Sequence, residues 1–191
     1  YHYLDQHPDI YVPKIKELNF FSSNKYSDKE LDLYFQKFSA ANKIAVGEFS
    51  TSYTSAPHRS GIPKRIFSAL GRVKLIYILR DPIDRLMSHY LHHVHRGEIR
   101  TDLPSMIRGM SHPMFMQGKY SYQIEQYLEY FPKECFLVLT IEDLKIKPME
   151  TVKRIYEFLE VTSSVDERML SNIHNNNAAV TKKSAFGLTV L

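Results

Sequence analysis

Residues 73–90, with the sequence VKLIYILRDPIDRLMSHY, decide the predicted fold of this chain. Residues 73–79 form a short run that is apolar on both faces and rich in β-branched and aromatic residues, which is typical of a strand buried in a parallel sheet. A helix is predicted to follow over 82–95, because Asp81 is a good N-cap and a proline suits the first helical turn. Arg80 is therefore expected at the carboxyl end of a buried strand, where a helix begins.

Arg80 is the centre of a predicted anion-binding site. A strand end and a helix N-terminus are expected beside it, and Arg85 and Ser88 follow one and two turns into the helix. Guanidinium groups, hydroxyls and helix N–H groups all bind phosphate oxygens, so we expect a phosphate here. Arg85 leaves a second interpretation open, because it stands four residues after Asp81 and could pair with it.

The composition is that of one globular domain. The 191 residues suffice for a full core, and 43% hydrophobic with 24% charged residues is ordinary for a soluble protein. A net charge of +4 and a pI of about 9.0 suit an anionic ligand as well as they suit nucleic acid. The single cysteine, Cys135, is expected to be buried, and a chain without a signal-peptide pattern and with one cysteine favours a reducing, cytoplasmic compartment.

Apolar strands alternate with amphipathic helices along the chain. Besides the strand and helix around Arg80, strands are predicted over 43–47 and 135–141, and helices over 62–70, 120–131 and 148–160. This alternation predicts an α/β domain with a mostly parallel central sheet flanked by helices. Such sheets bind ligands beyond the carboxyl ends of their strands, where Arg80 is expected.

Five segments resemble motifs of the sulfotransferases that use PAPS (3′-phosphoadenosine 5′-phosphosulfate). The pattern R-D-P-x-x-R-x-x-S-x-Y over 80–90 is similar to the motif that holds the 3′-phosphate of this cofactor. The others are HPD at 7–9, KELNFF at 16–21, GEFSTSY at 47–53, and GKY at 118–120 followed by EDL at 142–144. Together they cover nearly all of residues 1–160 and are similar to the heparan-sulfate-type and bacterial branch.

The resemblance implies one P-loop-kinase-like sulfotransferase domain over residues 1–191. It implies an enzyme that transfers a sulfuryl group from PAPS to a hydroxyl or amine of a carbohydrate, lipid or polyketide-like acceptor and releases PAP. In the family, a K-x-G-T-T loop cradles the 5′-phosphosulfate and directly precedes the helix with which this chain begins. No such loop occurs in the sequence, so we expect the domain as given to lack it.

Glu17 is implied by the resemblance as the general base, since the glutamate before x-x-F-F takes the proton of the acceptor in the family. An alcohol attacks sulfur poorly unless its proton leaves as the new bond forms. The residues alone also allow a plainer interpretation, in which Glu17 is an exposed carboxylate balanced by Lys14 and Lys16.

The resemblance implies cofactor contacts for six residues, namely Arg80, Ser88, Arg85, Tyr120, Lys182 and Lys183. Tyr120 is equally compatible with a core tyrosine at the start of a helix. Lys182 and Lys183 fall where relatives have a loop that closes over the cofactor, but serine and alanine follow them in place of glycine. A solvated basic tail is the alternative for these two lysines.

Two other function classes remain open on the sequence. Another P-loop-related transferase, such as a nucleotide kinase, needs a Walker lysine and an acidic Mg²⁺ ligand, whereas the strand over 73–79 ends in Arg80. A non-catalytic basic module that binds nucleotides or acidic polymers needs clustered cations with exposed aromatic residues. Here the aromatic residues are mostly at core spacing and acidic residues are mixed in.

We expect no metal, no nucleic-acid partner and no membrane span. His89, His92 and His93 share one face of a predicted helix, but cysteines or carboxylates at ligand spacing do not accompany them. The identity of the acceptor and the oligomeric state stay open.

Overall fold

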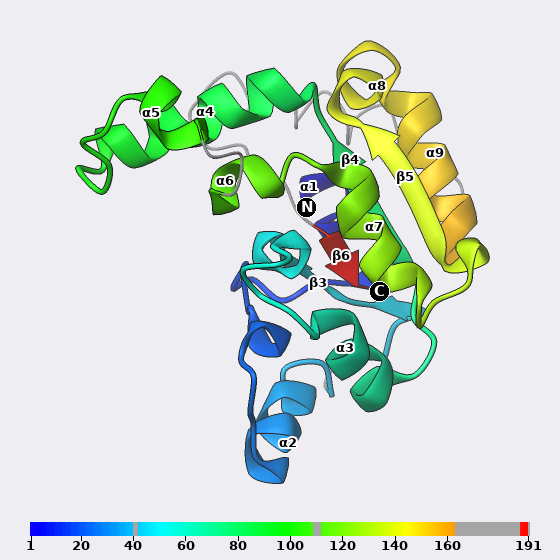
Figure 1. The fold of residues 1–191 in the computed structure, drawn as a ribbon. Helices are drawn as coiled ribbons and strands as arrows, with labels where there is room; N and C mark the ends of the chain where they lie inside the picture. The colour runs from blue at the N-terminus through cyan, green and yellow to red at the C-terminus, as the bar shows by residue number, and fades with distance from the viewer. Residues whose placement is uncertain (40–41, 109–111, 163–187, 191) are drawn as a thin grey trace.

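The computed structural model describes residues 1–39, 42–108, 112–162 and 188–190 (Figure 1). The helices are α1 (His2–Asp5), α2 (Asp28–Gln36), α3 (Ile62–Leu70), α4 (Pro82–His95), α5 (Leu103–Ile107), α6 (Pro113–Met116), α7 (Tyr120–Leu128), α8 (Ile141–Ile146) and α9 (Pro148–Leu159). The strands are β1 (Ile10–Tyr11), β2 (Ala45–Val46), β3 (Glu48–Ser50), β4 (Leu75–Leu79), β5 (Phe136–Thr140) and β6 (Leu188–Val190). Single 3-10 turns cover Phe20–Ser22, Thr51–Thr54 and Lys133–Cys135.

The described strands form two sheets. β1 and β2 pair in parallel, and the larger sheet has the order β3-β6-β4-β5. β4 and β5 are parallel, with Leu75 opposite Phe136 and Leu79 opposite Thr140. β6 is antiparallel to both β3 and β4, so β3, β4 and β5 point the same way. The predicted α/β fold with a mostly parallel sheet is confirmed, although β6 is not among the predicted strands.

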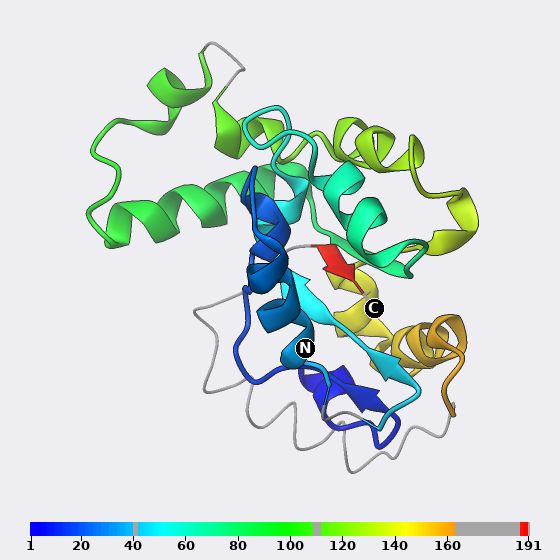
Figure 2. The ribbon, with the colours of Figure 1, turned by 90° about the horizontal axis from the view of Figure 1, so that it is seen from below.

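Both faces of the larger sheet are covered, which explains why β4 is apolar throughout. Leu75 and Tyr77 pack into a cluster with side chains of α3 and α7. Ile76, which lies between them, packs into a second cluster with α1, β1 and α9, because successive strand residues point to opposite faces. Figure 2 shows α3 and α7 on one side of the sheet and α9 on the other.

The four predicted helices begin at the predicted residues, but α3 and α7 each leave an apolar residue partly exposed. α9 buries the face that consists of Val152, Ile155, Tyr156 and Leu159. Phe67 of α3 is 37% exposed and Leu128 of α7 is 40% exposed, because the buried faces of these helices centre on Ile66 and Tyr127. Phe67 still contacts the ring of Phe131, with the ring centres 5.5 Å apart.

Two predicted strand boundaries differ from the structure. The strand predicted over 43–47 is reduced to β2, and the chain passes through Gly47 into the separate strand β3. Cys135 does not open β5 but ends the 3-10 turn before it, where the thiol is half-buried against the core instead of fully buried.

α4 and α5 extend away from the sheet (Figures 1 and 2). Four apolar side chains of α4 are 36–70% exposed, namely Ile83, Met87, Leu91 and Val94. Within the described ranges, no helix is both long enough and apolar enough to cross a membrane. The start of α4 lies at the sheet, and Arg80 immediately precedes the N-cap of this helix.

Candidate active site

Arg80 lies where the sequence predicts, between the end of β4 and the start of α4. Asp81 caps α4, and its carboxylate accepts hydrogen bonds from the N–H groups of Ile83 at 3.0 Å and Asp84 at 2.9 Å. The Arg80 side chain is 22% exposed, and one guanidinium nitrogen lies 3.5 Å from the Asp84 carboxylate. The Asp81 cap satisfies two of the α4 N–H groups that the sequence analysis expected to face a phosphate, so these two groups already have a partner within the chain.

Tyr120 is brought to Arg80 by the packing of α7 against β4. The Tyr120 hydroxyl donates a hydrogen bond to the Arg80 carbonyl oxygen at 2.8 Å. Its ring meets that of Tyr77 edge-on, with the centres 5.9 Å apart. Burial raises the pKa of Tyr120, so the hydroxyl keeps its proton at neutral pH. Tyr120 therefore lies beside Arg80 and also packs on the core, while its contact with a cofactor stays a prediction.

Arg85 turns into the protein and does not pair with Asp81, so that alternative is wrong. Asp81 is occupied by the helix cap, and the Arg85 guanidinium donates to the carbonyl oxygen of Met114 in α6. The residue is 7% exposed, and its Nε is buried without a partner among the described residues. A Cβ on Gly118 would lie 3.0 Å from this guanidinium, so only glycine fits there without a shift.

The remaining predicted cofactor residues lie on α4 or beyond the described ranges. Ser88 is half-buried on α4, and no hydrogen bond joins its hydroxyl to another described residue. Lys182 and Lys183 lie outside the residues that the structure describes.

Glu17 is held by the segment that follows β3. Its Oε2 accepts hydrogen bonds from the backbone N–H of Thr51 at 2.8 Å and from the Thr51 hydroxyl at 2.9 Å. None of the described residues donates a hydrogen bond to Oε1 of this half-buried side chain. Lys14 and Lys16 are exposed and form no described ion pair with Glu17; Lys16 instead lies 4.0 Å above the ring of Tyr1. The plainer interpretation of Glu17 as a carboxylate balanced by lysines is therefore wrong.

Glu48 is a buried carboxylate that the sequence interpretation did not single out. It is 2% exposed on β3, and hydroxyl groups of Tyr34, Ser50 and Tyr53 donate to it. The alternation of Glu48, Phe49 and Ser50 along a strand is the signal that could have placed both polar residues on one buried face.

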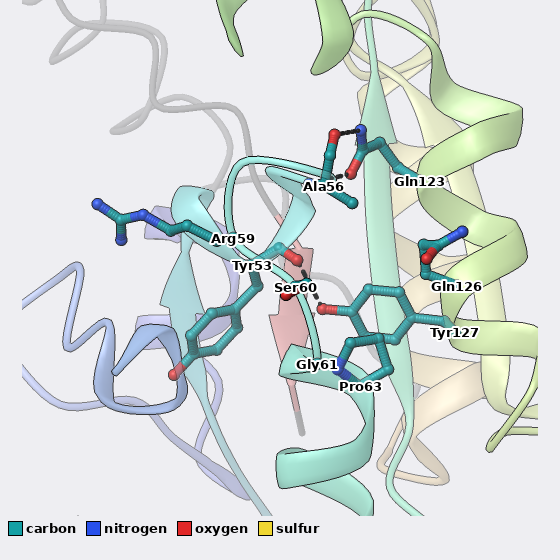
Figure 3. A pocket seen from close by; sticks show the side chains of 9 residues that line it. All are labelled: Tyr53, Ala56, Arg59, Ser60, Gly61, Pro63, Gln123, Gln126 and Tyr127. Atoms are coloured by element: carbon teal, nitrogen blue, oxygen red, sulfur yellow. Dashed lines mark hydrogen bonds between the residues drawn. The ribbon is translucent and has the colours of Figure 1, made fainter. Parts of the chain in front are cut away.

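Gln123 joins α7 to the segment that carries Tyr53. It is 1% exposed, its Oε1 accepts from the Ala56 N–H at 2.9 Å, and its Nε2 donates to the Ala56 carbonyl oxygen at 2.8 Å (Figure 3). One turn later, the Tyr127 hydroxyl donates to the Tyr53 carbonyl oxygen at 2.8 Å. These residues line a small hollow between α7 and the 53–63 segment. The same helix thus contacts both the Arg80 backbone and the 53–56 segment, which follows the Thr51 that binds Glu17.

The comparison that decides the family is a match to the model of the sulfotransferase domain, which covers residues 13–187. This chain belongs to the sulfotransferase family. The matched range includes Glu17, Arg80, Ser88 and Tyr120.

The sulfotransferase domain is similar to parts of longer proteins. Bifunctional heparan sulfate N-deacetylase/N-sulfotransferase 3 of Homo sapiens is 27% identical over 179 residues, covering 84% of this chain and 20% of the relative. Bifunctional heparan sulfate N-deacetylase/N-sulfotransferase 2 of Homo sapiens is 26% identical over 163 residues, covering 77% and 18%. The chain thus spans about a fifth of the length of the curated relatives it matches.

A solved structure confirms the predicted fold class. The sulfotransferase from Alicyclobacillus acidocaldarius superimposes with a TM-score of 0.70 at 25% identity, covering 93% of this chain and 85% of that one. The predicted sulfotransferase fold is therefore confirmed in both sequence and structure.

The histidines of α4 do not form a metal centre in the described part of the sulfotransferase domain. His89 and His93 lie with their ring centres 4.8 Å apart, and His93 contacts Glu98. Among the described residues, no group of three or more histidine, cysteine or acidic side chains could hold a metal ion. Burial, together with His93, Arg85 and other neighbouring cations, lowers the pKa of His89 to about 4.

Proposed function

We propose that this sulfotransferase uses PAPS as donor and transfers its sulfuryl group to a hydroxyl or amine, with Glu17 as general base. The observation that carries the proposal is the arrangement of the Glu17 carboxylate. Oε2 accepts both hydrogen bonds from Thr51, while Oε1 has no described donor. A base needs an oxygen that is fixed in position and available for a proton, and Oε1 meets both needs.

The proposed reaction is an in-line displacement at sulfur. The acceptor oxygen or nitrogen forms a bond to sulfur as its proton moves to Glu17, and the bond from sulfur to the phosphate oxygen of PAPS breaks. The electron pair of the broken bond stays on the 5′-phosphate of the product PAP. By analogy with phosphoryl transfer, cationic groups and N–H donors would stabilise the charge that grows on this phosphate.

The residues around the start of α4 fit the 3′-phosphate of PAPS. Arg80 offers a planar pair of N–H donors at the end of β4, and Ser88 offers a neutral donor two turns along α4. Tyr120 supports the Arg80 backbone through its hydroxyl. Arg85, Lys182 and Lys183 complete the proposed set on the strength of the resemblance. PAPS itself would supply the activated sulfuryl group.

The acceptor and the compartment are two further parts of the proposal. The names of the relatives, which include heparan sulfate N-sulfotransferase, support a carbohydrate amine or hydroxyl among the possible acceptors. A reducing, cytoplasmic compartment remains proposed from the single Cys135.

The experiment that tests the donor is calorimetric titration of PAP, with adenosine 5′-phosphate as control. Both nucleotides are titrated into this chain under the same conditions. We expect selective binding of PAP. Equal affinity for the two nucleotides, or no binding of either, would contradict the use of PAPS and favour a non-catalytic basic module.

A further inference from the structure

Glu48 is a buried carboxylate without a described cationic partner. Oε1 accepts hydrogen bonds from the hydroxyls of Tyr34 at 2.9 Å and Tyr53 at 2.6 Å, and Oε2 accepts one from Ser50 at 2.9 Å. Removing a carboxylate from water is costly unless its oxygens are well satisfied. Burial raises the pKa of Glu48, while the three hydroxyl hydrogen bonds act in the opposite direction. Because burying the Glu48 carboxylate costs free energy, we expect this side chain to have a structural role.

Two of these three hydroxyls have a second partner, and both second partners lie beside Glu17 in the chain. The Ser50 hydroxyl accepts a hydrogen bond from the Asn19 N–H at 2.9 Å. The Tyr53 hydroxyl accepts one from the Phe21 N–H at 3.3 Å. A hydroxyl has one proton, so donating it to Glu48 leaves the lone pairs to face these amides. Glu48 therefore sets the direction of both hydroxyls.

The 17–21 segment needs such support because its backbone is unusual. Glu17 has a φ of 58° and Asn19 a φ of 52°, both in the left-handed region that non-glycine residues rarely adopt. The Glu17 N–H also donates to the Phe49 carbonyl oxygen at 2.9 Å, so β3 holds the segment at several points. Because the backbone at Glu17 directs its side chain toward Thr51, a change in this conformation would move the carboxylate.

We propose that Glu48 is a positioning residue for sulfuryl transfer, which acts through Ser50 and Tyr53 to fix the 17–21 backbone and with it the carboxylate of Glu17. The proposal rests on the proposed role of Glu17 as the base. Glu48 does not contact the reacting atoms. It accepts hydrogen bonds from the Ser50 and Tyr53 hydroxyls, which in turn accept hydrogen bonds from the 17–21 backbone.

Tyr53→Phe and Tyr34→Phe form a matched pair that tests this proposal. Each variant removes one hydroxyl that donates to the same oxygen of Glu48, and each keeps its aromatic ring. Only the Tyr53 hydroxyl also contacts an amide of the 17–21 segment. We expect Tyr53→Phe to lower kcat by about 10- to 100-fold with an unchanged KM for PAPS, because small displacements of a catalytic group have effects of this size. Tyr34→Phe should change kcat by less than about threefold, since losing an isolated neutral hydrogen bond has a modest effect.

Combination with Glu17→Gln separates positioning from general stability. If Tyr53 acts through Glu17, then Tyr53→Phe should cause no further loss of kcat once Glu17 has been replaced. Equal losses of kcat in the two tyrosine variants, or additive losses in the double variant, would overturn the proposal. Full transfer activity in Glu17→Gln alone would instead overturn the proposed function.

A second measurement needs no substrate. Amide hydrogen exchange at Phe21 should be faster in Tyr53→Phe than in the unmodified chain, and unchanged in Tyr34→Phe. Exchange at Asn19 should be faster in Ser50→Ala for the same reason. Unchanged exchange at both amides would overturn the proposal, because the hydroxyls would then not hold the segment.

Discussion

The two halves of the candidate site are built in different ways. Around Glu17, groups of β3 and of the 3-10 turn after it hydrogen-bond the 17–21 segment, and two of their hydroxyls also donate to the buried carboxylate of Glu48. Around Arg80, the groups that fit a phosphate lie along one helix that extends away from the sheet, and the Ser88 hydroxyl has no described hydrogen-bond partner. This difference in hydrogen bonding suits the proposed chemistry. A general base must be fixed in position before the reaction, whereas groups that bind a phosphate can adjust when the ligand binds.

The largest expected effect comes from replacing Glu17, which lies at the centre of the hydrogen-bonded half of the site. Glu17→Gln keeps the shape and the hydrogen bonds to Thr51 but cannot take a proton, so transfer should fall by about 10²- to 10⁴-fold. Affinity for PAP should stay within about twofold, since the phosphate-binding half is untouched. Single-turnover transfer and calorimetry measure the two quantities. Glu129→Gln, which changes an exposed carboxylate, is the control. A parallel loss of transfer and PAP affinity would make Glu17 structural.

A change in the Arg80 half of the site should alter the affinity for PAP. Arg80→Ala should weaken PAP binding by about 10- to 100-fold, because charge-assisted hydrogen bonds contribute about 1.5–3 kcal/mol. Binding of adenosine 5′-phosphate should hardly change, since it has no 3′-phosphate. Titration of both nucleotides measures this, and Arg72→Ala, an exposed arginine before the opposite end of β4, is the matched control. If Arg80→Ala weakens both nucleotides equally, Arg80 does not recognise the 3′-phosphate.

Gly118→Ala tests how α4 is anchored, because Gly118 lies against the Arg85 guanidinium of that helix. The added Cβ would lie 3.0 Å from the Arg85 guanidinium and 3.3 Å from the Phe115 carbonyl oxygen. Overpacking of this kind costs about 1–3 kcal/mol, so the thermal midpoint should fall by several degrees. Ser121→Ala, an exposed position in the first turn of α7, should have little effect. Weaker PAP binding at unchanged stability would show that Arg85 serves the cofactor without anchoring α4.

The last expected effect appears only in acid, as a pH dependence of stability that arises at His89. Its pKa is lowered from 6.5 to about 4 in the folded state, by burial first and then by His93, Arg85, His92 and His112. Between these pH values the unfolded chain binds more protons at this residue than the folded chain does, so stability falls as the pH drops from 6.5 to 4. Denaturant unfolding across this range measures the loss. It should be smaller in His89→Gln, and an identical slope would show that His89 does not contribute.

Local patterns predicted much of the Arg80 region. The apolar run of β4, the Asp81 cap and the start of α4 are consecutive in sequence, so the position of Arg80 follows from short-range preferences. The inward turn of Arg85 could not be predicted in the same way, because its acceptor is the Met114 carbonyl oxygen in a different helix.

The Glu17 region was only partly predictable. The resemblance marked Glu17, but nothing near it in sequence indicates Thr51 as its partner, which lies 34 residues away. β3 and β6 are three residues long, too short for a periodic pattern to show. Gln123 is polar and therefore looks like a surface residue, yet it is buried because both its amide atoms pair with Ala56.

α7 connects the Arg80 backbone to the segment that follows Thr51. Its first residue, Tyr120, contacts the Arg80 backbone. Gln123, one turn later, contacts the backbone of Ala56, in the segment that follows Tyr53. Each residue of a helix turns the chain by about 100°. An insertion or deletion of one residue between Tyr120 and Gln123 would rotate one contact away from its partner while the other stayed in place. This single turn should therefore tolerate changes of side chain far better than changes of length.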